Sequence, residues 1–249
     1  MSLLKTDAII LKSWELGEAD RIFSVFSRSY GKLRVVAQGV RRTKSRFSGC
    51  MQPFSYDHLV IYKGRSIPRV NQCEIKESFT LLREDLSRMA YSSYVAELVD
   101  EFTGEEDRNE ALFSLLLAAL TFIKDGWDLE VVTRNFEIRA LSLLGYQPQL
   151  HRCVSCGREI EQEEKLGFSP AKGGVLCSTC RSQGFSLQAG SLAFLRKFLE
   201  GHSRQLKHMR LPGYAGQELE MLLGKYLEYY LEKPLKSRQF INTLRNLNP

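Results

Sequence analysis

The chain has 249 residues and a mass of 28.5 kDa; 43% of its residues are hydrophobic and 26% are charged. This composition is typical of a globular protein with a sizeable core, and it excludes a collagen-like fibre and a chain that is disordered throughout. The longest apolar run covers residues 115–120, well short of the roughly 18 residues of a membrane span, so we expect no membrane partner. Lys5 and Asp7 interrupt the first apolar run and no cleavage site of small residues follows. We therefore expect no signal peptide, a cytoplasmic protein and reduced cysteines.

The formal net charge of +6 is distributed unevenly along the chain. Residues 1–80 hold 14 Lys and Arg against 7 Asp and Glu, residues 81–150 hold 6 against 13, and residues 151–249 hold 15 against 9. The pattern predicts a basic module, an acidic middle and a basic end. Basic surface on a cytosolic protein favours nucleic acid as the partner, and the alternative is that the charges only solvate the fold.

The first eighty residues alternate between short apolar runs and turn residues. Glycine-containing turns near residues 17, 31 and 64 separate five predicted strands, at 7–12, 21–26, 32–37, 59–62 and 68–75. Five short strands in about seventy residues favour a small closed barrel, because closure removes exposed strand edges. We predict an OB-type β-barrel domain over residues 1–80, with an SH3-like barrel as the alternative.

A cationic segment lies between the third and fourth predicted strands. Four of the six residues at positions 41–46 are cationic: Arg41, Arg42, Lys44 and Arg46. Cationic groups neutralise phosphates, and hydroxyls such as that of Ser45 donate to phosphate oxygens. The aromatic ring of Phe47 is a candidate for stacking on an unpaired base. We therefore predict a DNA-binding surface here, extended by four further cations if they share its face: Lys32, Arg34, Arg65 and Arg69.

From residue 81 the hydrophobic period becomes helical. One apolar stripe runs from Leu82 to Phe102, a second helix is predicted from Glu110 to Lys124, and Asp128 is placed to cap a third that ends before Gly145. Further helices are predicted at 191–200, at 216–231 and after Pro234. The predicted fold class is therefore α+β multidomain, with a helical bundle domain made of residues 81–150 and 185–249.

Four cysteines form two closely spaced pairs within residues 151–184. Cys153 and Cys156 form the first pair, and Cys177 and Cys180 follow after twenty residues, across a predicted hairpin. Two such turns can place four thiolates around one tetrahedral Zn²⁺, with Zn–S distances of about 2.3 Å. A Cys₄ site is closed to substrate, so we predict one structural zinc. A redox Cys-x-x-Cys motif is the alternative, but it would need one pair at a strand-to-helix junction.

Motifs of common enzyme classes are absent from the sequence. It contains no phosphate-binding P-loop, no Gly-x-Gly-x-x-Gly dinucleotide fingerprint and no His-Glu-x-x-His zinc protease motif. We therefore predict a protein that is not an enzyme. Two other functions are compatible with the sequence: a zinc-ribbon transcription or translation factor that acts through protein contacts, and an oxidoreductase that uses the cysteines.

The sequence resembles the bacterial recombination mediator family RecO along its whole length. The most specific stretches are Gly39-Val-Arg-Arg-Thr-Lys-Ser and Lys233-Pro-Leu-Lys-Ser-Arg. Weaker matches lie at residues 16–22, 30–32, 134–137 and 144–146, and the cysteine pairs add to them.

The resemblance implies a function that the residues alone do not give. It implies an N-terminal OB-fold, a zinc module, binding of single- and double-stranded DNA, and annealing of complementary strands. It also implies partnership with RecR, and loading of RecA onto DNA coated by single-stranded-DNA-binding protein (SSB). Arg134 matches a family position linked to the acidic C-terminal tail of SSB. Such a protein is cytoplasmic and associated with the nucleoid.

Overall fold

The computed structural model describes residues 2–47, 49–161, 165–201 and 203–247. Its contacts group the chain into two compact units: residues 1–125 together with 235–249, and residues 126–234. The first unit holds the barrel, three helices that follow it and the C-terminal helix, and the second holds the cysteine module with three helices. The three-part division at residues 80, 150 and 184 stays a prediction, because it follows changes of secondary structure rather than compactness.

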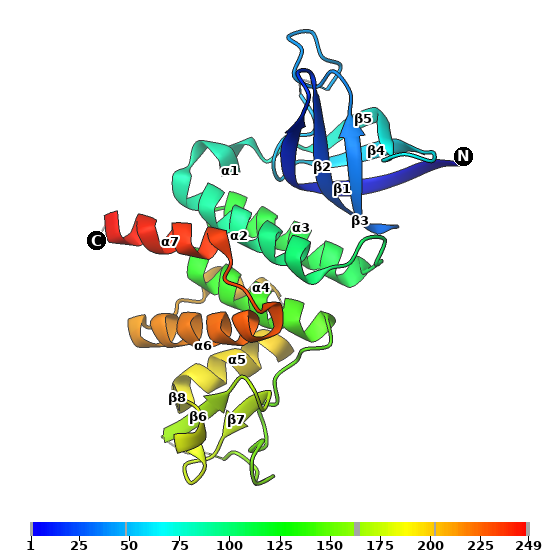
Figure 1. Cartoon of the computed structure of the whole chain (residues 1–249). Helices are drawn as coiled ribbons and strands as arrows, with labels where there is room; N and C mark the ends of the chain where they lie inside the picture. The colour runs from blue at the N-terminus through cyan, green and yellow to red at the C-terminus, as the bar shows by residue number, and fades with distance from the viewer. Residues whose placement is uncertain (1, 48, 162–164, 202, 248–249) are drawn as a thin grey trace. The chain divides into compact units, whose positions relative to one another are not determined.

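Five antiparallel or parallel strand pairings close an N-terminal barrel, as predicted (Figure 1). The strands are β1 (Ser2–Leu16), β2 (Asp20–Ser27), β3 (Gly31–Ala37), β4 (Tyr56–Lys63) and β5 (Arg69–Glu77). Their order around the barrel is β1-β2-β3-β5-β4, and β4 pairs again with β1. The one parallel pairing joins β3 to β5, at Val36 and Arg69. This arrangement is an OB-type barrel, and it excludes the SH3-like alternative.

The barrel core takes every second residue of each strand, because successive side chains of a strand point to opposite faces. Phe23 and Val25 of β2 and Leu33 and Val35 of β3 are fully buried in it. The β3–β4 loop adds further core residues: Phe47, Cys50 and Met51. The loop therefore closes one end of the barrel with its own apolar side chains and is held there by burial.

Four helices complete the first unit: α1 (Thr80–Glu84), α2 (Leu86–Phe102), α3 (Glu110–Lys124) and α7 (Lys236–Leu247). α2 packs against α1, α3, α7 and strands β1 and β2. The single helix expected over residues 82–102 is wrong. Asp85 has extended backbone angles, and its carboxylate accepts a hydrogen bond from the Arg88 backbone N–H, so it ends α1 and caps α2.

The second unit contains α4 (Leu129–Leu143), α5 (Ala189–Glu200), α6 (Gly213–Leu231) and the short 3₁₀ helices η1 (Arg181–Gln183) and η2 (Ser203–His208). Asp128 caps α4 as predicted, by accepting from the Val131 N–H at 3.0 Å. After Leu143 the chain turns at Gly145, where the expected helix stop lies. None of the helices in the described part of the chain is long and apolar enough to cross a membrane.

A small three-stranded sheet lies within the second unit. It consists of β6 (Lys165–Ser169), β7 (Gly174–Leu176) and β8 (Phe185–Gln188), in the order β7-β6-β8. The hairpin of β6 and β7 was predicted, and β8 was not. Phe168 of β6 packs edge-on against Tyr226 of α6, with ring centroids 5.3 Å apart. This contact ties the sheet to the helices of its unit.

Candidate metal centre and nucleic-acid interface

The four predicted ligand cysteines converge on one point. Their sulfur atoms, those of Cys153, Cys156, Cys177 and Cys180, all lie within 4.8 Å of one another. Each pair is shaped by a tight turn: the Gly157 N–H donates to the Cys153 carbonyl, and the Cys180 N–H donates to the Cys177 carbonyl. Gly157 has a φ of +78°, a conformation that suits glycine and few other residues. The cluster could hold a metal ion.

The surroundings of the cluster favour thiolates at two of its members. Burial raises the pKa of Cys153, but backbone N–H donors of residues in both pairs outweigh burial and lower that pKa to about 6. The pKa of Cys177 is also lowered, against the effect of burial, chiefly by the backbone N–H of Cys180. Metal ions bind cysteine as the thiolate, so these donors favour binding. His151 stays outside the cluster, with its ring 3.7 Å from the carboxylate of Glu200.

The predicted basic loop is exposed and anchored. Arg41, Arg42, Lys44 and Arg46 all lie on the surface. The Arg41 guanidinium lies 3.1 Å from the Glu15 carboxylate, which ties the loop to the β1–β2 turn. The expectation that Phe47 can stack on a base is wrong, because its side chain is only 1% exposed and lies in the barrel core. Phe47 instead holds the loop in place, and Arg46 lies over its ring.

Two of the four additional cations lie in or next to the β4–β5 turn. Arg65 is exposed in the β4–β5 turn, and Arg69 is exposed at the start of β5. Arg69 pairs with Val36 near the end of β3, so it lies near the start of the basic loop. Later residues of the loop contact the other end of the β4–β5 hairpin, where the Met51 N–H donates to Asp57.

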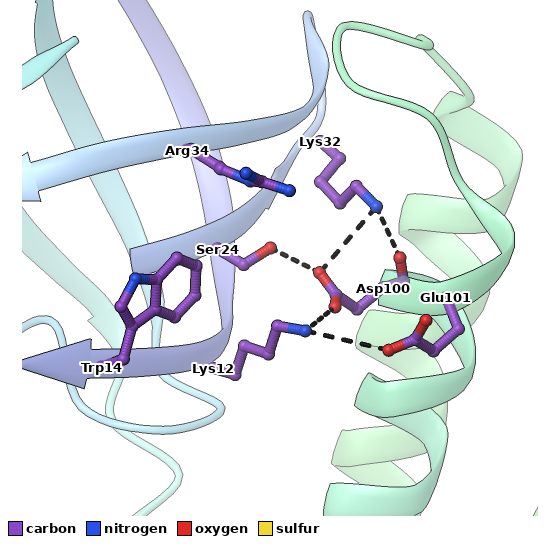
Figure 2. A pocket seen from close by; sticks show the side chains of 7 residues that line it. All are labelled: Lys12, Trp14, Ser24, Lys32, Arg34, Asp100 and Glu101. Carbon is purple, nitrogen blue, oxygen red and sulfur yellow. Dashed lines mark hydrogen bonds and ion pairs between the residues drawn. The ribbon is translucent and has the colours of Figure 1, made fainter. Parts of the chain in front are cut away.

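The other two cations lie beside helix α2. The Lys32 ammonium is hydrogen-bonded to the Asp100 carbonyl, 4.0 Å from the Asp100 carboxylate, and its side chain is 13% exposed. Arg34 donates from Nε to Glu105 at 2.7 Å. Figure 2 shows both side chains on the barrel wall, with Lys32 directed towards Asp100. Their part in DNA binding stays a prediction, and the structure gives each of them an acidic partner within the protein.

Lys32 and Arg34 also line a pocket that sequence reasoning missed. The pocket has a volume of about 390 Å³, and its other walls come from β1, β2 and the end of α2: Lys12, Trp14, Ser24, Asp100 and Glu101 (Figure 2). No local signal in the sequence indicates this pocket. Strict alternation would place Lys12 and Trp14 on the same face as the core residues Ala8 and Ile10, and a register shift between Ile10 and Lys12 turns them outward.

Arg134, the residue predicted to contact the SSB tail, is buried in α4. Its side chain is 3% exposed, and its guanidinium lies 3.0 Å from the carboxylate of Glu137 and 3.8 Å from that of Glu130. A salt bridge to a nearby carboxylate is the ordinary structural role of such an arginine. The tail contact at Arg134 stays a prediction.

Comparison with known proteins identifies the family. The model for the N-terminal domain of recombination protein O matches residues 1–79, and the model for its C-terminal domain matches residues 83–239. The chain belongs to the RecO family. It is 38% identical to the DNA repair protein RecO of Desulforamulus reducens, over 100% of this chain and 97% of that protein. It is 39% identical to the RecO protein of Symbiobacterium thermophilum, over 99% of each.

The similarity to the RecO family extends over the whole chain, and less similar relatives also align over nearly its whole length. The RecO protein of Halalkalibacterium halodurans is 32% identical over 98% of this chain and 96% of its own length. The resemblance stated from the sequence is confirmed. The Lys233–Arg238 stretch that supported it has a structural role: Glu97 of α2 accepts hydrogen bonds from the backbone N–H groups of Lys236 and Ser237, which caps the start of α7.

Proposed function

We propose that this RecO-family chain is a recombination mediator that binds single- and double-stranded DNA and anneals complementary strands. The observation that carries the proposal is the exposed cationic loop. Its apolar residues Phe47, Cys50 and Met51 are buried in the barrel core and hold the loop in place. An OB-type barrel with a charged loop is a common platform for nucleic acid. No bond needs to be made or broken in this activity, so the proposed protein is not an enzyme.

The proposed mechanism is electrostatic. Two complementary strands repel each other through their phosphates, and a surface that binds both reduces this repulsion and raises their local concentration. Arg42 and Lys44 are exposed on the loop, and Arg69 is exposed beside the end of β3, from which the loop starts. Backbone contacts of this kind carry no sequence information, so binding should be independent of sequence.

Alanine substitution of the loop cations tests this proposal. The variant replaces Arg41, Arg42, Lys44 and Arg46. For each phosphate that the substitutions leave without its cation, the slope of log affinity against log salt concentration for single strands should fall in magnitude by roughly 0.7. Binding of labelled oligonucleotides of several sequences, measured from low to high salt, gives both affinity and slope.

A matched control removes four exposed lysines of the second unit: Lys165, Lys197, Lys207 and Lys225. Both variants lose four positive charges, so a specific role for the loop requires a larger decrease in affinity in the loop variant. Equal decreases would mean that net charge, not this loop, governs binding. Annealing of two complementary labelled strands separates this function from that of a zinc-ribbon factor acting by protein contacts, which would not accelerate annealing.

We also propose that the cysteine cluster holds one structural Zn²⁺. In a tetrahedron with bonds of about 2.3 Å, neighbouring sulfurs lie about 3.8 Å apart, and the Cys156 and Cys177 sulfurs are 3.7 Å apart. Four sulfur donors and no oxygen donor favour zinc over hard cations such as Mg²⁺. Elemental analysis of protein purified without chelator should find about one zinc per chain, and a redox pair of disulfides would give none.

The proposed partners follow from the family. We infer that the chain acts with RecR, contacts the acidic C-terminal tail of SSB, and thereby helps to load RecA onto SSB-coated single strands. For the tail contact we keep Arg134 as the candidate. Arg134→Glu should weaken binding of a labelled tail peptide and leave affinity for bare single strands intact. Equal peptide affinity of the two proteins would exclude Arg134, and the burial of this side chain makes a thermal-unfolding measurement the necessary control for misfolding.

A further inference from the structure

The outer surface of strands β1–β3 carries one polar row that ends at an aromatic ring. Lys12 pairs in register with Ser24, and Ser24 pairs with Arg34, so these three side chains lie side by side across the sheet. Trp14 lies two residues further along β1 on the same face, next to this row. Asp100 and Glu101 of α2 stand opposite, and the space between is the pocket of about 390 Å³ (Figure 2).

The charges in this pocket balance. Lys12 pairs with the carboxylates of Asp100 and Glu101, Lys32 contacts Asp100, and Ser24 donates to Asp100. Arg34 is held through Nε by Glu105. A phosphate needs a surplus of positive charge, and here each cation already has a carboxylate partner. The pocket is therefore poorly suited to the DNA backbone.

The same groups suit a heterocyclic base. The indole of Trp14 is 36% exposed and provides a flat surface for stacking. Arg34 uses Nε for Glu105, and a guanidinium has four further N–H groups that can donate to base acceptors. The Glu101 side chain is 23% exposed, and a carboxylate can accept from the exocyclic amino group of a base.

The pocket and the cationic loop lie near each other along β1. Trp14 is followed directly by Glu15, whose carboxylate lies 3.1 Å from the Arg41 guanidinium. The two side chains point to opposite faces of the strand, so the loop and the indole are neighbours along β1 but lie on different faces. Because each cation of the pocket already has a carboxylate partner, the pocket offers phosphate no net attraction, so a bound strand would present its base, not its backbone, to the pocket.

We propose that this pocket is a nucleobase subsite, in which Trp14 stacks on one unpaired base of a bound single strand and Arg34 contacts the edge of that base. The inference rests on the proposed DNA-binding function and deepens it. It assigns phosphate binding to the loop and base binding to the β1–β3 surface. It also predicts a preference for single strands, because paired bases are not available for stacking.

Tryptophan fluorescence tests the subsite directly. The chain has two tryptophans, so Trp127→Phe leaves Trp14 as the only one. The probes are an oligothymidylate and an abasic oligonucleotide of equal length, which has the same phosphates but no bases. The oligothymidylate should quench Trp14 emission, and the abasic strand should bind through the loop without quenching. Binding of the oligothymidylate without quenching would overturn the subsite and leave the proposed function standing, whereas absence of all binding would overturn both.

Substitution gives a second readout. Trp14→Ala should weaken oligothymidylate binding roughly 5- to 150-fold, the cost of removing one stack, with an unchanged salt slope and unchanged affinity for the abasic strand. Trp14→Phe should restore much of the affinity, because it keeps an aromatic face. Leu3→Ala is the matched control, since Leu3 is an exposed apolar residue of the same strand, away from the pocket. Equal affinity of Trp14→Ala and Leu3→Ala for oligothymidylate would overturn the proposal.

Discussion

The barrel and the cysteine module are both small β-structures, but they are stabilised in different ways. The barrel closes on itself and buries a continuous apolar core, to which the β3–β4 loop contributes Phe47, Cys50 and Met51. The module has a three-stranded sheet of 5, 3 and 4 residues and brings four cysteine sulfurs together. A barrel can be stable on packing alone, whereas a sheet of this size is expected to need its metal.

The largest expected effect comes from removing a cysteine ligand. Cys177→Ser should release the metal and unfold the module, since for such sites the free energy of metal binding is largely free energy of folding. The barrel does not depend on this cluster, so DNA binding by the cationic loop should persist. Zinc content, hydrogen exchange of each unit and oligonucleotide binding together measure this difference.

Cys73→Ser provides the control for that experiment, because Cys73 lies on β5, packed against the barrel core and outside the cluster. Its zinc content should equal that of the parent protein. If Cys177→Ser keeps its zinc and its module stays protected, the module does not depend on metal and the contrast between the two regions is wrong.

A smaller effect on stability is expected from adding a methyl group at Gly31, in the unit that contains the barrel. Gly31 begins β3 with a φ of +67°, and an added Cβ would lie 2.0 Å from the Asp107 carbonyl oxygen. Gly31→Ala therefore combines an unfavourable backbone conformation with a steric clash, and should lower the free energy of unfolding by about 2–4 kcal/mol. Urea unfolding followed by circular dichroism measures it.

Gly17→Ala separates the two causes. Gly17 has a φ of +61°, but an added Cβ there meets nothing within 4 Å. Gly17→Ala should lower the free energy of unfolding by about 1–2 kcal/mol, the cost of the backbone conformation alone. Equal losses in the free energy of unfolding for the two variants would show that the loop around Asp107 moves to accommodate the new methyl group. The unit that contains the barrel would then be less tightly packed than we infer.

The smallest effect concerns an ionised carboxylate on the barrel. Burial raises the pKa of Asp7, but hydrogen bonds from Lys76, His58 and Tyr56 outweigh burial, and the net effect lowers the pKa below 3.8. The stabilisation is therefore present above the unfolded-state pKa and is lost as the pH falls through the folded-state pKa. Asp7→Asn should destabilise the protein by about 1 kcal/mol at pH 7, less at pH 3, as measured by urea unfolding at both values. A difference that grows towards low pH would contradict this sign.

Local patterns determined most of the elements from the sequence. Strand alternation located the five barrel strands, the spacing of Cys153, Cys156, Cys177 and Cys180 predicted their convergence, and Asp128 marked the start of α4. Each of these signals acts over a few residues or through a turn of known geometry. The apolar period of residues 82–102 continues across Asp85 and therefore predicted a single helix. The break between α1 and α2 depends on one residue, Asp85, whose carboxylate caps α2, and hydrophobic periodicity does not reveal such a cap.

The tertiary structure alone decided what the charged and aromatic side chains face. Lys32 contacts Asp100, 68 residues away in sequence, so a cation predicted to bind DNA is turned towards a helix. Phe47 sits among cations in the sequence but fills the barrel core, while Trp14 stays on the surface beside a pocket. A sequence records which charges exist, but pairing and burial depend on segments that meet only when the chain has folded.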